Sequence, residues 1–397
     1  MNKWLTLSSK GAAAAALSIC ATSTLAAPTQ DSSVAPVATI SHEELVEMVQ
    51  QQQELIESLS TTPAQASASS TTFGGYGELH LNKLSNDGPD GDKDQIDLHR
   101  VVLFVGHEFS DSVRFYSEIE WEHGIAGDGK KGETEIEQAY IEFDILAQSA
   151  IKAGVFLVPV GIINETHEPD TFYGVERNPV EKNIIPATWW EGGALFNSEV
   201  SPGLSIDAAI HSGLYLDVAS GKYKVRDGRQ KVSKAKADAL AYTGRIAYRG
   251  IPGLELAGTV QYQSDMAQDT YQDKIPAILV EMHANYQQGP LGLKALYATW
   301  AIDDKIEAAS GKAGSDDQTG YLLEASWKFI PEVGAFVRYN VWDNTAGSSV
   351  DSEYAQIDFG INYWPHPNVV VKADYQIQDA PGANEYDGFN LGIGYSF

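Results

Sequence analysis

Residues 387–397 read DGFNLGIGYSF, a run in which large apolar residues alternate with small or polar ones. On an extended strand, Phe389, Leu391, Ile393, Tyr395 and Phe397 would share one face, and the residues between them the other. A period of two residues predicts a β-strand with one apolar face. The same alternation recurs along the chain and decides its fold class.

Sixteen such segments follow residue 72, and short turns between them alternate with longer loops rich in Gly and Asp. Ten residues tilted near 40° cover roughly 25 Å, the height of the apolar band of a bacterial outer-membrane barrel. We therefore predict an all-β fold, a transmembrane antiparallel β-barrel of about 16 strands over 73–397. The predicted strands span 73–82, 96–109, 113–122, 135–145, 151–160, 193–199, 204–213, 240–249, 254–263, 278–286, 291–302, 321–329, 335–342, 353–363, 369–378 and 387–397.

Charges on the predicted strands indicate where the water lies. In 113–122, Phe115, Ile119 and Trp121 share one face, whereas Glu118 and Glu120 share the other. A Lys or Arg that faces lipid at the bilayer midplane costs about 2–4 kcal/mol, so the charged faces are expected to line a wet lumen. Acidic residues outnumber basic ones on these faces. The predicted lumen-wall residues are Arg100, Arg114, Glu118, Glu120, Glu142, Arg245 and Arg338.

Three segments are predicted before the barrel. Residues 1–26 have the basic start, apolar run and small residues of a cleaved signal peptide. Residues 41–60 predict a short helix that Ser41 and Glu44 can cap, with coiled-coil spacing or as a frayed amphipathic helix, placed in the periplasm. Residues 61–72 complete the 27–72 region as a flexible linker. The one cysteine lies in the signal peptide, so the mature chain is expected to form no disulfide.

The segment 161–192 is the longest stretch without a regular period. A structureless run of this length inside a compact domain is usually functional. We predict a loop folded into the barrel, where its charges face the wall across a narrow passage and bias which ions enter. The alternative is an external loop packed over the mouth. The charged residues of the predicted constriction are Glu165, His167, Glu168, Asp170, Glu176, Arg177, Glu181, Lys182 and Glu191.

A second segment, 222–236, reverses the charge of an otherwise acidic chain. It is either a funnel that draws anions inward or a solvated loop that touches lipopolysaccharide phosphates. Its basic residues are Lys222, Lys224, Arg226, Arg229, Lys231, Lys234 and Lys236.

Other functions find little support in the sequence. The formal net charge of −27 argues against nucleic acid as a partner. Residues 124–131 (GIAGDGKK) approach a phosphate-binding loop but lack the Ser or Thr and the following helix. Four aspartates in 87–94 could hold calcium, but the EF-hand spacing fails and a solvated loop is favoured. No protease or hydrolase motif and no metal-ligand spacing occurs, so we expect neither an enzyme nor a cofactor.

Several stretches resemble the porin O/P family, the phosphate-selective-type porins of Gram-negative outer membranes. They are 154–161 (GVFLVPVG), 173–177 (YGVER), 184–192 (IIPATWWEG), 228–231 (GRQK), 244–248 (GRIAY) and 252–256 (PGLEL). The resemblance implies a trimeric pore of sixteen strands with the third external loop folded inward. It also implies a lumen lined by Lys and Arg, from which this mixed wall departs. The final strand resembles the sorting signal that the barrel-assembly machinery reads.

These observations predict a passive outer-membrane porin for small hydrophilic solutes and ions, trimeric and in contact with lipid and lipopolysaccharide. An anion- or phosphate-selective channel is the alternative within the same fold. An envelope tether with a non-conducting barrel is the alternative from another class.

Overall fold

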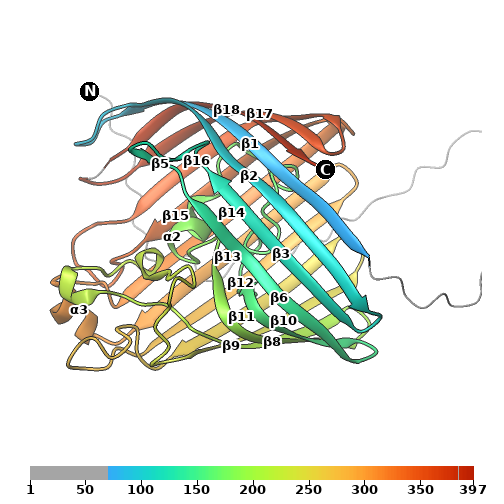
Figure 1. The fold of residues 1–397 in the computed structure, drawn as a ribbon. Coiled ribbons are helices and arrows are strands. Elements are labelled where there is room, and N and C mark those ends of the chain that lie inside the picture. Colours follow the sequence, from blue (N-terminus) through green and yellow to red (C-terminus); the bar gives the residue numbers. More distant parts are fainter. Residues whose placement is uncertain (1–69, 383) are drawn as a thin grey trace, which may run out of the picture. The chain divides into compact units, whose positions relative to one another are not determined.

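The computed structural model describes residues 70–382 and 384–397, which form a closed antiparallel barrel (Figure 1). Sixteen strands make the ring, and β1 pairs with β18 to close it. The predicted barrel is thereby confirmed. The strands are β1 (Thr71–Asn86), β2 (Lys93–Ser110), β3 (Val113–Glu122), β6 (Thr134–Leu146), β7 (Ser149–Leu157), β8 (Trp190–Ser201), β9 (Leu204–His211), β10 (Ala241–Ile251), β11 (Leu254–Gln263), β12 (Ala277–Gln288), β13 (Leu291–Ile302), β14 (Asp317–Ile330), β15 (Val333–Asp343), β16 (Tyr354–His366), β17 (Val369–Asp379) and β18 (Tyr386–Ser396).

The connections follow the predicted alternation. Short turns join strands at one end of the barrel, and the long loops gather at the other end, on the left of Figure 1. The loop after β3 holds a small hairpin of β4 (Ala126–Gly127) and β5 (Lys130–Lys131), where the sequence approached a phosphate-binding loop. The described part of the chain contains no helix long and apolar enough to cross a membrane.

The predicted N-terminal segments lie almost wholly outside the described residues. This holds for the signal peptide 1–26, the helix 41–60 and most of the linker 61–72. The linker prediction extends too far, because Thr71 and Thr72 already belong to β1. Their pairing with His107 and Gly106 of β2 lengthens the strand.

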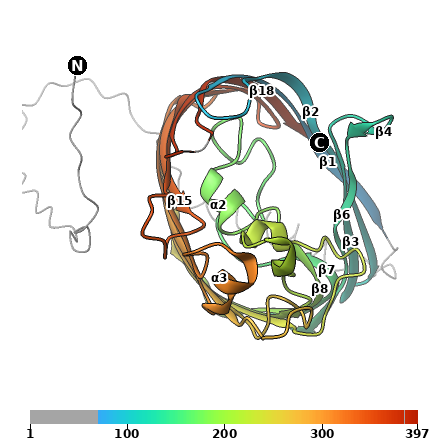
Figure 2. The same ribbon diagram turned by 90° about the vertical axis from the view of Figure 1, so that its left-hand side faces the viewer.

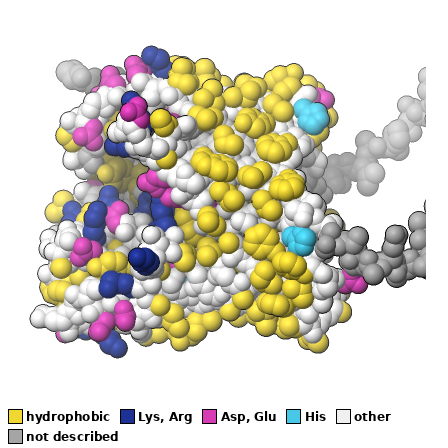
Figure 3. All heavy atoms as spheres, viewed as in Figure 1, with side chains coloured by type: hydrophobic (Ala, Val, Ile, Leu, Met, Phe, Trp, Pro, Cys, Tyr) yellow, Lys and Arg dark blue, Asp and Glu magenta, His cyan; other side chains and the backbone are white. Residues whose placement is uncertain are grey.

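The outer surface is apolar, as the two-residue period requires. In β16, Ile357, Phe359 and Ile361 are 39%, 45% and 52% exposed, whereas the intervening Asp358 is 3% exposed and faces inward. Figure 3 shows hydrophobic side chains over the middle of the barrel face, with charged groups gathered at the end that carries the long loops. A belt of this kind suits contact with lipid.

The lumen is not wet throughout, which corrects the prediction of a water-lined interior. Long loops enter the barrel and bury an apolar core against the inner faces of β12–β15. The short helices α2 (Pro179–Asn183), η1 (Val218–Ser220), η2 (Val225–Gly228) and α3 (Lys305–Ser310) belong to these loops. Figure 2, a view along the barrel, shows the loop that carries α2 crossing the interior. Beside the apolar packing lies a cavity that is lined by residues of β1, β2 and β6 and by a few of β16, β17 and β18.

Candidate pore constriction

The inner loop (residues 158–189) connects β7 to β8 and closes on itself through buried hydrogen bonds. Asn164 Nδ2 donates to Val158 O at 2.8 Å, and its Oδ1 accepts from Trp189 N at 2.7 Å, so one amide joins the two ends of the loop. These bounds correct the predicted loop 161–192, because residues 190–192 already belong to β8. The inner loop is a folded unit with its own polar brace.

Side chains of the wall hold the tip of the inner loop. Arg338 donates to Tyr173 O at 3.2 Å and to Glu176 O at 3.3 Å. Lys372 Nζ donates to Gly174 O at 2.8 Å, and the Asp374 carboxylate accepts from the next amide of the loop at 2.6 Å. Buried backbone groups left without partners are costly. These wall residues therefore fix the position of the loop and not only its charge.

Glycines on the inner face of the wall make room for the same loop. A Cβ at Gly394 would lie 2.7 Å from Pro169 Cγ, and one at Gly392 would lie 3.1 Å from Val175 Cγ1. Both glycines alternate with the outward aromatic and aliphatic residues of β18. The small inward residues of the terminal strand are thus explained by close packing of the inner loop.

Two predicted constriction acids do not face the passage, which corrects the prediction for them. Glu181 is fully buried and accepts hydrogen bonds from the amides of Ile162 and Ile163 at 2.7 and 2.8 Å. Glu191, also fully buried, accepts from Trp189 Nε1 at 2.9 Å. Both carboxylates brace backbone or indole donors, a role that the sequence pattern did not reveal.

Other predicted loop acids meet the wall. Glu165 pairs with Arg245, and Asp170 accepts from the Ser396 hydroxyl at 2.8 Å. Glu176 accepts from Asn82 Nδ2 at 3.0 Å. Glu168 is half-buried.

His167 joins the inner loop to the wall by charge. Its Nε2 lies 3.4 Å from a carboxylate oxygen of Glu118 and 3.4 Å from one of Glu137. Burial and the nearby Arg177 oppose protonation, yet the two carboxylates raise the pKa of His167 to about 9. A charged His167 therefore offsets two buried acids at neutral pH.

The arginines of the predicted lumen wall are paired with acids. Arg100 lies 2.8 Å from Glu78 and 3.3 Å from Glu120. Arg338 lies 3.0 Å from Asp358. The remaining pairs are Arg114 with Glu142 at 2.7 Å and Arg245 with Asp207 at 2.7 Å. The positive charges of these four wall arginines are thus offset by neighbouring acids.

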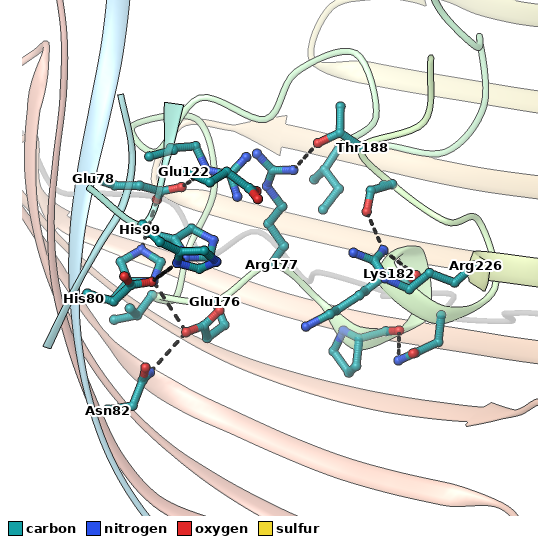
Figure 4. Close-up of a pocket in the computed structure, with 18 of the residues that line it drawn as sticks. Glu78, His80, Asn82, His99, Glu122, Glu176, Arg177, Lys182, Thr188 and Arg226 are labelled. Carbon is teal, nitrogen blue, oxygen red and sulfur yellow. Dashed lines mark hydrogen bonds and ion pairs between the residues drawn. The ribbon is translucent and has the colours of Figure 1, made fainter. Parts of the chain in front are cut away.

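The basic cluster, defined as Arg177, Lys182, Arg226 and Arg229, differs in this respect. It comes from the inner loop and the 212–240 loop. It lines a cavity of ≈ 600 Å³ opposite an acidic and histidine-bearing wall (Figure 4). Within residues 70–382 and 384–397, none of the four makes an ion pair. Arg226 donates to two loop carbonyls at 2.8 Å, and Arg229 to a third at 2.7 Å.

Three guanidinium nitrogens of the basic cluster are buried without a hydrogen-bond partner, two on Arg177 and one on Arg229. Burial, and then the like charges of Arg229 and Arg177, lower the pKa of Arg226 to about 9. Crowded cations with spare donors form a site that an anion would stabilise.

The predicted anion-funnel residues divide into two groups. Arg226 and Arg229 reach the cavity. Lys231 also lines it but binds Glu133 at 2.6 Å. The others lie at the exposed mouth: Lys222 lies 3.9 Å from Asp227, Lys236 lies over the ring of Tyr215, and Lys224 and Lys234 are exposed.

Sequence reasoning missed the histidines of this cavity. His80 and His99 come from β1 and β2, and their rings stack with centroids 4.5 Å apart. Each has a carboxylate two residues earlier, Glu78 and Asp97, which places acid and imidazole on one face of a strand. This spacing could have indicated an oriented histidine on each strand, but only the pairing of β1 with β2 shows that the two histidines are neighbours.

Comparisons with known proteins show the family and the fold. Residues 73–380 match the family described as phosphate-selective porin O and P. An uncharacterised protein of Aquifex aeolicus is 31% identical over 357 residues, which cover 82% of this chain and 80% of that protein.

Solved structures share the fold at low sequence identity. The anion-selective porin from Comamonas acidovorans superimposes with a TM-score of 0.60 at 12% identity, covering 83% of this chain and 100% of that one. The outer-membrane channel DcaP of Acinetobacter baumannii gives 0.59 at 14% identity, covering 83% and 98%. OmpF of Salmonella typhi gives 0.57 at 15%, covering 82% and 97%.

Proposed function

The chain belongs to the phosphate-selective porin O and P family and is an outer-membrane porin. We propose the following path for solutes through its barrel. Small hydrophilic solutes and ions diffuse passively between the inner loop and the wall formed by β1, β2 and β6. The inner loop sets the size limit, because its apolar side packs with other loops against the inner faces of β12–β15. Family and fold indicate a channel, so no catalytic step is assigned.

The basic cluster is the observation that carries the ion preference. The wall arginines are compensated by acids within a few ångströms, whereas these four cations have only carbonyl, hydroxyl or no partners. A permeating anion would meet four cations without an ion pair there, and planar guanidinium groups suit carboxylates and phosphates. We therefore favour the anion-selective alternative, with small oxyanions including phosphate as the solute class.

Further assignments concern assembly, the membrane and the N-terminal segment. OmpT of Vibrio cholerae, a similar fold, is described in a trimer form, and we propose a homotrimer here. The apolar belt suits outer-membrane lipid, and the exposed Lys222, Lys224, Lys234 and Lys236 suit lipopolysaccharide phosphates. The alternating β18 supports recognition by the barrel-assembly machinery. A periplasmic helix over 41–60 remains the sequence-based expectation.

The deciding experiment is the reversal potential of single channels in a planar bilayer under a KCl gradient. A potential of the sign that favours Cl⁻ supports the proposal, and phosphate should then compete with Cl⁻. A sign that favours K⁺ contradicts the anion preference but leaves a porin. Folded protein that gives no channels would contradict conduction itself and support the envelope tether.

A further inference from the structure

The wall opposite the basic cluster carries the histidine cluster, defined as His80, His99 and His123 with Asp97 and Glu176. Figure 4 shows His80, His99 and Glu176 turned toward the same part of the cavity. His80 Nδ1 lies 3.4 Å from Glu176 Oε1. One ligand atom each from His80, His99 and Glu176 lies within 4.8 Å of the others.

We propose that His80, His99 and Glu176 bind one divalent transition-metal ion, with Zn²⁺ as the reference metal. Two imidazoles and one carboxylate are a ligand set that zinc accepts, at about 2.0–2.2 Å from each atom, with a fourth position open to water. Closing around the ion requires ligand atoms that now lie within 4.8 Å of one another to come to about 3.3–3.5 Å, which rotations of the three side chains can supply. The open position would face the cavity water.

A buried ring nitrogen also points to this site. His80 is 3% exposed, and its Nδ1 makes no hydrogen bond, although it faces Glu176 Oε1 at 3.4 Å. Its other nitrogen, Nε2, lies 3.1 Å from Glu78 Oε2. The tautomer that donates Nε2–H to Glu78 leaves a lone pair on Nδ1, aimed at Glu176. In this tautomer the Nδ1 lone pair and the Glu176 carboxylate repel each other across 3.4 Å, and a metal ion bound between them would remove that repulsion.

The outer contacts have the form that metal-binding histidines require. His99 Nδ1 lies 3.3 Å from Asp97 Oδ2, which orients this ring as Glu78 orients that of His80. Carboxylates that accept from the second ring nitrogen fix the tautomer and increase ligand basicity. Asn82 holds Glu176 at 3.0 Å. Lys93, 3.9 Å from Glu176, is the one cation the ion would displace among the described contacts of this carboxylate.

A neighbouring set of ligands, Asp97, His99 and His123, competes for the same ion. His123 Nδ1 lies 2.8 Å from Asp97 Oδ2, so here the carboxylate is already shared by two rings. His123 is also 39% exposed along its side chain. Burial, the free nitrogen and two separate orienting acids all favour the set with His80.

Binding would place two positive charges and a water shell in the passage. Because the site lines the cavity between the inner loop and the wall, an occupied site would narrow the path of permeating ions. The inference holds for either ion preference of the pore, since the ligands do not include the basic cluster.

The test uses full-length folded protein in detergent, titrated with ZnCl₂ by calorimetry after chelator treatment. We expect one site per chain, and His80→Gln or His99→Gln should weaken affinity at least about tenfold. His107→Gln is the matched control, because His107 lies on the same strand as His99 but contacts Thr71 at the opposite end. Glu78→Gln, which removes the acid that orients His80 and also the ion pair of that acid with Arg100, should weaken binding too.

Single-channel recording gives the second readout. Micromolar Zn²⁺ should lower the conductance reversibly, EDTA should restore it, and His80→Gln should abolish the effect. Equal affinity in His80→Gln and wild type, or a loss confined to His123→Gln, would overturn the proposed ligand set. Binding in detergent does not depend on conduction, so failure of the porin proposal and failure of the metal proposal are distinguishable.

Discussion

Gly394→Ala should displace the inner loop without unfolding the barrel. The added Cβ would overlap Pro169 Cβ and lie 2.7 Å from Pro169 Cγ, against about 3.5–4.0 Å for an ordinary carbon–carbon contact. The loop must move by at least about 1 Å, and overpacking of this kind typically costs about 1–3 kcal/mol. The ratio of channels with the loop in its native position to channels with a displaced loop would then fall roughly 5- to 150-fold, since about 1.4 kcal/mol corresponds to a tenfold change in an equilibrium constant. Single-channel conductance and open-channel noise should both increase.

A graded control and a compensating change make this test specific. Gly392→Ala approaches Val175 at 3.1 Å, so its effect should be clearly smaller. Pro169→Gly removes the opposing atoms and should restore quiet channels in the Gly394→Ala background. Folding is checked by heat-modifiable migration in gels. Folded Gly394→Ala channels indistinguishable from wild type, or a double variant as noisy as Gly394→Ala, would refute the packing argument.

Three further outcomes are expected. Arg226→Gln with Arg229→Gln should shift the reversal potential in a KCl gradient toward K⁺, whereas the exposed Lys224→Gln should leave it nearly unchanged. The pKa of His167 is raised, so the contribution of this residue to loop attachment is fully present below its ordinary pKa near 6.5 and is lost as pH rises through about 9. The noise of the open channel should therefore increase as pH rises through about 9. The His167→Gln channel should be noisy already at neutral pH. Ile184→Ala, at a fully buried site of the apolar core, should destabilise the seated loop by about 2–5 kcal/mol, seen as faster hydrogen exchange in 158–189 with barrel exchange unchanged.

The barrel was predictable because its strands obey a local rule. The alternation of apolar and polar residues along 353–363 or 387–397 separates the lipid-facing side from the inner side, and no knowledge of the neighbouring strand is needed. Turn residues such as Pro202 and Gly203 then mark the short connections. Only strand ends differ from the prediction, as at β1, which begins at Thr71.

The site was less predictable because it is assembled from distant segments. Glu181 has the sequence appearance of a pore acid, yet its environment is set by amides 18 and 19 residues away. The apolar core inside the lumen joins four loops to four strands, and no single segment shows a period that reveals it. His80 and His99 become neighbours only through the antiparallel pairing of β1 and β2.

The seam between β1 and β18 has a consequence for the order of assembly. Asn82 and Asn390 bond across it at 2.8 Å although 308 positions separate them in the chain, whereas every other pair in the ring joins strands that follow each other along the chain. Hairpins can form early, but closing the ring is a slow, non-local event that leaves two unpaired edges while it waits. Part of the seat of the inner loop, including Asp374, Gly392 and Gly394, belongs to the last two strands. We therefore expect the width of the pore to be fixed only at the final step of folding, when the last two strands close the barrel.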